Sequence, residues 1–363
     1  MMKNIARHTL YGWRLWEYVE RERHRIGTRQ VERWHLSDMH SQRRINYLAR
    51  WLASHVAKQC RNGHVTVSSQ WIDQYPQAHS HYQLPGSPAP HTVSVELADL
   101  LLLVQVVNQQ QTTISERAAL LQAKCCQRPD ALDPPHDTST LKERNLLEAC
   151  CAPLRVTRDS GSTAAPINPA HAQYDLGATP QTPGLKPYAR YLLIPLGKLP
   201  RTLPYQLLWP SQLHAGQGPM LHLAEAILAM TGLGLPTHYA GHPLNPPGAA
   251  TDWDHLVRDL IQYCTRQPNL NRFASQTQRT IPREVYARYD LGQISPLRTI
   301  VRALLSKGLQ MSGLERWLQM TAIPAGPRLP PPVPTPDSEA PSGGFTVLTV
   351  RIQVDGPLSP RAD

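Results

Sequence analysis

Proline is concentrated in a few stretches of this chain, and its placement limits where long helices can run. The 363 residues include 35 prolines, about twice the ordinary share. Each proline lacks a backbone N–H and restricts the residue before it, so every proline-rich patch disfavours continuous helix. We therefore expect compact parts joined by long irregular connections.

Two stretches have the composition of connections between domains. Residues 153–187 are rich in Pro, Gly, Ser and Thr with little periodicity, which is typical of a linker. Residues 323–344 centre on the sequence PRLPPPVPTP, which favours an extended polyproline II tether. These stretches divide the chain into a basic helical domain (1–152), a mixed α/β domain (188–322) and a terminal strand (345–354).

The beginning of the first domain shows helical periodicity. We predict helices over residues 4–25 and 29–36, and a third helix whose apolar face holds Ile45, Leu48, Leu52 and Val56. His64–Val67 then alternates like a strand. Three helices followed by a strand favour a helix-turn-helix or winged-helix module. The alternative is a helical packing domain with arginines on its outer faces.

The rest of the first domain is read as loop and helix. Gln74–Pro90 is rich in His, Pro and Gln and is predicted as a loop, whereas Ser94–Gln109 is apolar nearly all round, as a buried helix or a strand pair would be. Ser115–Cys126 looks helical. A second helix is expected from about Thr140, where Thr140 and Glu143 form a possible capping box, to Cys151.

In the second domain, Tyr188–Leu196 is predicted to be a strand that ends at a sheet edge. Helices are expected at Met220–Thr231, at Trp253–Cys264 and around residues 297–305. Phe345–Val354 alternates cleanly and should either pair with the strand at Tyr188 or join the sheet of a partner. The predicted fold class is therefore α+β, predominantly helical, with a small sheet in the second domain.

The strongest functional signal is a basic stretch with interleaved aromatic residues at Lys3–Arg61. It contains 13 Lys or Arg against 5 Asp or Glu, a surplus of eight in a chain whose formal net charge is +10, and four of the eight Trp. Arginine forks grip phosphate and aromatic rings stack on bases. The predicted nucleic-acid contacts are Arg21, Arg23, Arg25, Arg29, Arg33, Arg43, Arg44, Arg50, Lys58 and Arg61.

This pattern predicts a non-enzymatic protein that binds RNA or DNA through its phosphate backbone, as one subunit of a larger nucleoprotein complex with protein partners. The alternative is a scaffolding protein that assembles with itself or binds an acidic protein partner. In that case the basic stretch would be a protein-protein surface, and the proline-rich tract a linker or a ligand for an aromatic groove.

No motif of real specificity predicts a catalytic residue, a metal site or a cofactor. The pairs Cys125-Cys126 and Cys150-Cys151 lack the two-residue spacing of zinc knuckles and are read as buried small hydrophobes. His79, His81 and His91 have a spacing that could hold a metal, but the favoured interpretation is a solvated loop. A metal- or histidine-dependent nuclease remains a third hypothesis, for which His79 and His81, or His55 as a general base, are candidates.

Cysteine usage and apolar runs bear on the compartment. Six cysteines without a secretory signal favour reduced thiols, as in the cytoplasm, the nucleoid or the nucleus. The longest apolar run, Leu100–Val107, is too short to span a bilayer, so no membrane association is expected.

Overall fold

More of the chain is sheet than helix. The computed structural model describes residues 36, 39–57, 59–60, 62–72, 76–84, 86–87, 89–126, 132, 138–158, 164–195, 206–208, 221–232, 241–266, 283–293 and 345–354. Strands hold 40% of these residues and helices 29%. The α+β class is therefore correct, but the prediction that it is predominantly helical is wrong. The helices expected at 4–25 and 297–305 lie outside the described residues, as does the one expected at 29–36 except for Leu36, which is helical and buried.

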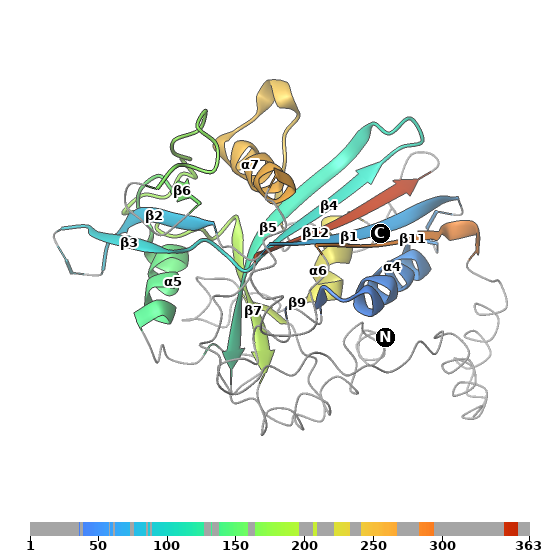
Figure 1. Cartoon of the computed structure of the whole chain (residues 1–363), viewed down its shortest axis with the longest axis horizontal. Helices are drawn as coiled ribbons and strands as arrows, with labels where there is room; N and C mark the ends of the chain where they lie inside the picture. The colour runs from blue at the N-terminus through green and yellow to red at the C-terminus, as the bar shows by residue number, and fades with distance from the viewer. Residues whose placement is uncertain are drawn as a thin grey trace.

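Helices and strands alternate irregularly along the described chain (Figure 1). The helices are α4 (Gln42–Val56), α5 (Thr138–Ala149), α6 (Leu223–Met230) and α7 (Asp252–Arg266), with short 3-10 turns η5 (Pro247–Ala249) and η6 (Leu291–Gln293). The strands are β1 (Gly63–Ile72), β2 (Gln77–Tyr82), β3 (His91–Glu96), β4 (Leu100–Val107), β5 (Thr113–Cys126), β6 (Arg155–Thr157), β7 (Ala189–Pro195), β8 (Gln206–Leu208), β9 (Leu221–His222), β10 (His242–Pro243), β11 (Glu284–Asp290) and β12 (Phe345–Val354).

One large mixed sheet organises the molecule. Among the described residues, nine strands join it in the order β11-β1-β12-β4-β5-β7-β8-β9, with β10 pairing on β5. Two neighbouring pairs are parallel, β12 with β4 and β5 with β7, and the others are antiparallel. A separate three-stranded sheet has the order β3-β2-β6.

The last described strand lies in the interior of this sheet. β12 pairs antiparallel with β1 over its whole length, Phe345 opposite Ile72 and Val354 opposite Gly63, and parallel with β4 on its other side. The predicted strand at 345–354 is confirmed. Its predicted pairing is wrong, because β12 bonds neither to β7 nor to a partner but fills the space between two strands from early in the chain.

Two sequence patterns were misread in the middle of the chain. Ser115–Cys126, predicted as helix, is most of strand β5, which is buried on both faces and bonds to β4 on one side and to β7 and β10 on the other. A strand covered on both faces carries a continuous apolar run without alternation, so its periodicity resembles that of a buried helix. The predicted loop Gln74–Pro90 contains β2. β7 is confirmed as a strand, but it is internal rather than at an edge.

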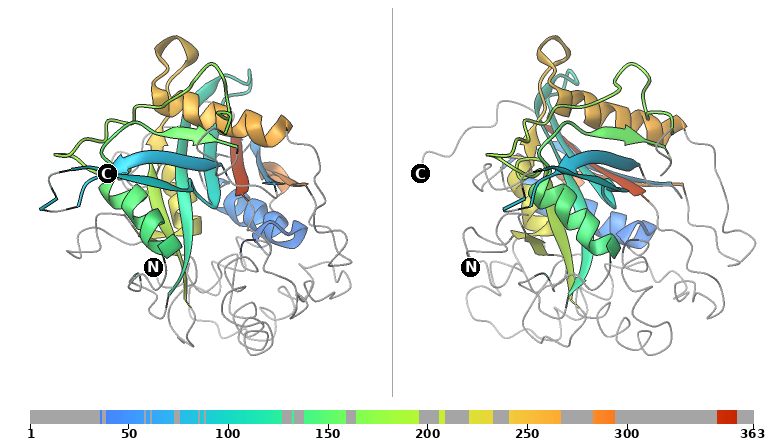
Figure 2. Two further views of the ribbon diagram at one scale, coloured as in Figure 1. Left: turned by 60° about the vertical axis from the view of Figure 1, so that its left-hand side comes forward. Right: turned by 90° about the vertical axis from the view of Figure 1, so that its left-hand side faces the viewer.

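Two hydrophobic cores lie on opposite faces of the main sheet. On one face α4 and α6 pack against alternate residues of β1, β4, β11 and β12, and on the other face α7, α5 and the second sheet form the other core. Figure 1 shows α4 and α6 below the sheet and α7 above it, and the turned views in Figure 2 keep α7 and α4 on opposite sides. The sheet is therefore the middle layer of the fold.

Helix α4 covers the strands that carry the candidate site. Ser41 caps it by accepting a hydrogen bond from the backbone N–H of Arg44, at 3.4 Å. The predicted apolar face is confirmed, since Ile45, Leu48, Leu52 and Val56 are all buried in the core that α4 shares with β1 and β12. Each such aliphatic side chain contributes about 1.5–3 kcal/mol by leaving water, so this face fixes α4 on the sheet.

Helix α7 is confirmed, and a carboxylate in its first turn caps its N-terminus. The Asp254 carboxylate accepts four hydrogen bonds, from the backbone and side chain of Thr251 and the backbone and side chain of Asn245. Burial acts to raise the pKa of Asp254, but these hydrogen bonds outweigh it and lower the pKa below its ordinary value. Asp254 therefore acts as a negative charge in the first turn of α7.

The stretch 153–187 packs closely where the structure describes it. Ile167, Tyr174, Leu176 and Leu185 are buried in the core that contains α7. Strands from before and after this stretch also share the main sheet, as the pairing of β5 with β7 shows. The division into domains at 153–187 and 323–344 remains a prediction.

Two further observations concern cysteines and membranes. All six cysteines carry free thiols. None of the helices in the described part of the chain combines the length and apolarity needed to cross a bilayer.

Candidate nucleic-acid interface

The predicted basic surface is described at only two of its positions. Arg21, Arg23, Arg25, Arg29, Arg33, Lys58 and Arg61, and the side chain of Arg43, lie outside the described residues. Arg44 and Arg50 are half-buried on α4, off its buried face. Six residues separate them, which places them about 120° apart around the helix axis. The described structure does not bring these two arginines together.

A different polar surface is well described on the sheet itself. It lies on the face of β11, β1 and β12 that is turned away from α4, and we call it the open face; its members are His64, Thr66, Ser68, Glu284, Tyr286, Arg288, Asp290, Thr349, Arg351 and Gln353. In each of these three strands, the alternate residues Val65, Ala287 and Val350, among others, are buried against α4. The period of two residues separates the two sets completely.

Strand register lines these polar residues up in rows across the sheet. In one row Arg288 is opposite Thr66, and Thr66 is opposite Arg351. In the next row Tyr286 is opposite Ser68, and Ser68 is opposite Thr349. A third row joins Asp290, His64 and Gln353. Neighbouring strands are about 4.8 Å apart, so Arg288 and Arg351 stand roughly 10 Å apart with a short threonine between them.

The short central residues make the open face hollow. A depression of about 420 Å³ is lined by His64, Thr66, Gln111, Tyr286, Arg288, Arg351 and Gln353. Thr66 contributes from the middle strand, whereas the arginines and Tyr286 come from the two flanking strands. A small residue at the centre and long residues at the sides produce a concave surface on an otherwise flat sheet.

Part of the same sheet face is covered, and the composition of β12 changes where the cover ends. Phe345 and Val347 are buried in the core that contains α7, together with Leu101 and Leu103 of β4. The next residues on that face of β12 are Thr349, Arg351 and Gln353, which are only partly buried. Figure 1 shows α7 over one end of the sheet and away from the far ends of β1, β11 and β12.

A strained turn supplies one side of the hollow. Gln111 follows the tight turn between β4 and β5 and has a φ of +63°, a left-handed conformation that favours Gly or Asn. Its side-chain oxygen accepts a hydrogen bond from Arg351 (2.7 Å), and its amide nitrogen donates to Gln353 (2.8 Å). The unfavourable backbone conformation therefore places an amide over β12, where it orients Arg351.

The open face carries two arginines and two carboxylates, and both carboxylates, Glu284 and Asp290, lie on the edge strand β11. Arg288 lies 3.5 Å from Asp290, and both side chains are about half exposed, at 52% and 46%. An exposed pair of this kind contributes little stability, so Arg288 can exchange Asp290 for another anion at small cost. Arg351 donates its hydrogen bond to the neutral side-chain amide of Gln111 rather than to a carboxylate.

Sequence reasoning found one strand of this surface and missed another. The alternation of β12 was recognised, with Thr349, Arg351 and Gln353 on one face. The sequence EVYARYD at 284–290 has the same alternation, with the apolar residues Val285 and Ala287 on either side of Tyr286, but it was not assigned to a strand. The register that aligns β11 with β1 depends on long-range pairing, which no local pattern reveals.

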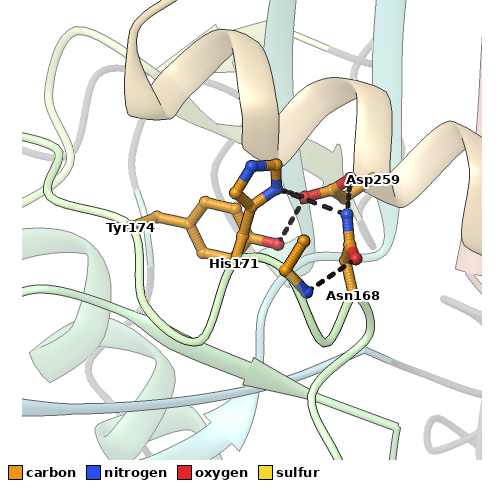
Figure 3. Close-up of polar contacts among 5 residues, drawn as sticks. Asn168, His171, Tyr174 and Asp259 are labelled. Carbon is orange, nitrogen blue, oxygen red and sulfur yellow. Dashed lines mark hydrogen bonds and ion pairs between the residues drawn. The ribbon is translucent and has the colours of Figure 1, made fainter.

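A second polar cluster fastens an irregular segment to α7 (Figure 3). The buried Asp259 carboxylate accepts hydrogen bonds from His171 Nδ1 (2.6 Å), the Tyr174 hydroxyl (2.8 Å) and Asn168 Nδ2 (2.7 Å). Burial, together with the carboxylate, raises the pKa of Tyr174, which keeps the hydroxyl a donor. Since all three donors come from one short segment and the acceptor from a helix, we assign the cluster a structural role.

The predicted histidine and cysteine candidates do not form a metal centre. His79 and His81 lie on one face of β2, where His79 contacts Thr157 (2.8 Å), whereas His91 lies opposite Tyr82 with its ring 5.4 Å away. Burial raises the pKa of the Cys150 thiol, which disfavours the thiolate that metals bind. No set of three or more potential ligands converges anywhere in the described residues.

His55, the candidate general base, is held within its own helix. Its Nδ1 lies 2.9 Å from the backbone oxygen of Trp51, and its ring stacks on the Trp51 ring with centroids 4.1 Å apart. These contacts account for the position of the ring on α4.

Comparison with known proteins gives no assignment. The chain matches no protein-family model, no curated protein by sequence and no solved structure by fold.

Proposed function

We propose that this protein binds nucleic acid, and that the open face of its main sheet is one of the surfaces that contact the strand. The observation that carries the proposal is the pair of arginines, Arg288 and Arg351, on either side of Thr66 in a concave, partly exposed surface beside Tyr286. Guanidinium groups bind phosphate bidentately, and an exposed ring beside them offers a stacking surface for bases.

Two further features support this surface over an ordinary solvated sheet. A sheet face that only contacts solvent does not require a non-glycine residue with a left-handed backbone conformation. Gln111 has that conformation, and its side chain orients Arg351. The polar residues around the centre of the hollow are uncharged (Thr66, Ser68, Thr349, Gln353). Among the described residues, no carboxylate at that position therefore competes with a phosphate for the two arginines.

The arginine-rich stretch before residue 62 fits the same function as a second, electrostatic surface. Its surplus of eight positive charges would hold the backbone non-specifically. The described arginines of that stretch, Arg44 and Arg50, are on α4, on the opposite side of the sheet from the open face. We therefore treat the two surfaces as separate contributors to affinity.

The test is a filter-binding titration of the whole chain with a single-stranded oligonucleotide over a salt series. Wild-type protein is compared with the double variant Arg288→Ala/Arg351→Ala and with Arg158→Ala, an exposed arginine beside β6 in the second sheet, as the matched control. Each lost phosphate contact should reduce the slope of log K against log salt by about 0.7–0.9. The double variant should lose up to two contacts, and the control none.

An affinity that does not change between low and moderate salt would contradict the proposal. Size-exclusion chromatography after nuclease treatment separates it from the scaffolding alternative. A protein that elutes as an oligomer, free of nucleic acid, and does not bind the oligonucleotide would favour the scaffold.

A further inference from the structure

We infer that the hollow on the open face holds one unpaired nucleobase stacked on Tyr286, so that the protein prefers single-stranded to duplex nucleic acid. This inference rests on the proposed function and narrows it. A protein that only gripped phosphates would bind both forms through their backbones, whereas stacking requires a base whose face is not already covered by its neighbours.

The ring of Tyr286 is exposed and its neighbours are short. Tyr286 is 51% exposed, the highest value of any large apolar or aromatic side chain in the described residues. The two residues that follow it across the sheet are Ser68 and Thr349, neither of which is long enough to cover a tyrosine ring. A large ring left uncovered on a sheet is the arrangement by which sheet-based RNA-binding modules stack bases.

The backbone that carries this ring is held firmly. β11 pairs with β1 over seven residues, and Val285 and Ala287, on either side of Tyr286, are buried against α4. On the outer edge of β11, the Gln42 side chain donates a hydrogen bond to the Tyr286 carbonyl oxygen, at 2.7 Å. The ring is therefore presented by a rigid support, which lowers the entropy lost on binding.

The size and the rim of the hollow fit one nucleotide. Its volume of about 420 Å³ is at the lower end of the range for small-ligand sites. Arg288 is two residues from Tyr286 on the same face of β11, roughly 7 Å along the strand, so a base on Tyr286 places a phosphate within its reach. At the far side, Gln353 lines the hollow; its amide oxygen accepts from Gln111, which leaves its amide nitrogen as a donor for a base edge.

The inference is tested with the full chain and four oligonucleotides of equal length: single-stranded RNA, single-stranded DNA, a DNA strand whose central positions are abasic, and a blunt DNA duplex. Fluorescence anisotropy at one fixed salt concentration gives the affinities. The wild type should bind at least one of the intact single strands about tenfold more tightly than the abasic strand and the duplex. The intact strand that binds more tightly identifies the preferred sugar.

Three variants assign the preference to the ring. Tyr286→Ala should lose about tenfold in affinity for the preferred single strand and nothing for the abasic strand. Tyr286→Phe keeps the ring and should stay within about twofold of the wild type. Leu141→Ala removes another exposed large side chain, 47% exposed on α5 and outside both proposed surfaces, and should have no effect. Should Tyr286→Ala not fold, Tyr286→Leu replaces it.

The outcomes distinguish a failure of the stacking inference from a failure of the proposed function. Equal binding of intact and abasic strands, or equal binding of single strand and duplex, overturns the stacking inference and leaves the proposed function standing. An unchanged affinity in the folded Tyr286→Ala variant also overturns it. Failure of the wild type to bind any of the four probes at low salt removes the proposed function itself.

Discussion

The two faces of strands β11, β1 and β12 differ as much as any two regions of the molecule, although adjacent residues supply them. On the covered face, Val350 and Ile352 are buried against the core of α4. On the open face, Arg351 lies between them and lines a hollow with Thr66 and Tyr286. Hydrophobic burial accounts fully for the first set. The second set is only partly buried or exposed, so burial does not account for it, and we attribute it to binding.

This difference between the two faces predicts a large difference in the free energy of unfolding between substitutions at two consecutive positions of β12. Val350→Asp places a charge in the covered core and should lower the free energy of unfolding by more than about 4 kcal/mol. Arg351→Asp changes charge by two on the open face and should lower it by less than about 1 kcal/mol. Urea denaturation followed by circular dichroism measures both. Equal losses would mean that the open face is covered in the native protein.

A smaller stability effect is expected at the helix that covers the other end of the open face. Asp254→Ala removes the carboxylate that caps α7 and should cost about 2 kcal/mol, because the donors on Thr251 and Asn245 lose their acceptor. Thermal unfolding of this variant, compared with Asp175→Ala at an exposed aspartate that accepts one hydrogen bond, from the Gly177 N–H, measures the loss.

The same cap predicts a pH dependence. The pKa of Asp254 is lower in the native protein than its ordinary value near 4, so the native state binds this proton more weakly than the unfolded state. Its stabilisation is therefore complete above about pH 4 and is lost as the pH falls through the lowered pKa. Asp254→Asn should flatten the acid limb of a stability-against-pH curve. A variant that keeps the wild-type acid limb would refute the assignment.

Removal of one arginine from the open face should affect binding and leave folding nearly intact. Arg351→Ala should weaken single-strand binding about three- to tenfold and lower the salt slope by about one contact. Anisotropy titrations at several salt concentrations measure both quantities. A loss of affinity with an unchanged salt slope would indicate that Arg351 positions Gln111 rather than contacting phosphate.

The smallest effects are expected at the strained turn. There one substitution should raise the free energy of unfolding and lower the affinity for nucleic acid. Gln111→Gly relieves the left-handed conformation and should raise the free energy of unfolding by up to about 1 kcal/mol. It also removes the amide that orients Arg351, so affinity should fall about two- to threefold. Gln110→Gly, one residue earlier in the turn, is the control. A Gln111→Gly variant that gains stability and keeps full affinity would show that the amide has no role in binding.

Local patterns predicted the covered elements better than the open site. The apolar face of α4 with Ile45 and Leu48 and the alternation of β12 depend on residues close in sequence, and both were predicted correctly. Strand β5 was mistaken for a helix because its Ala, Leu, Gln and Lys residues have high helix propensity, which burial between β4 and β7 overrides.

The open site could not be located from the sequence because its parts come from distant segments. Thr66, Gln111, Tyr286 and Arg351 meet only through the register of β1 with β11 and β12 and through the turn after β4. The basic stretch is visible in the sequence as a high density of positive charge. The open face has only two arginines, and their proposed contribution to binding depends on where the strand register places them. Composition identifies an electrostatic surface more readily than a shaped one.

The interior position of β12 has a consequence for how the protein is made. β1 and β4 are translated early, yet the strand that joins them is the last described element to leave the ribosome. Until then both carry unpaired edges that can recruit other chains. We expect nascent chains that stop before Phe345 to be captured by chaperones or to aggregate, so that quality control discards incomplete copies before they can compete for ligand.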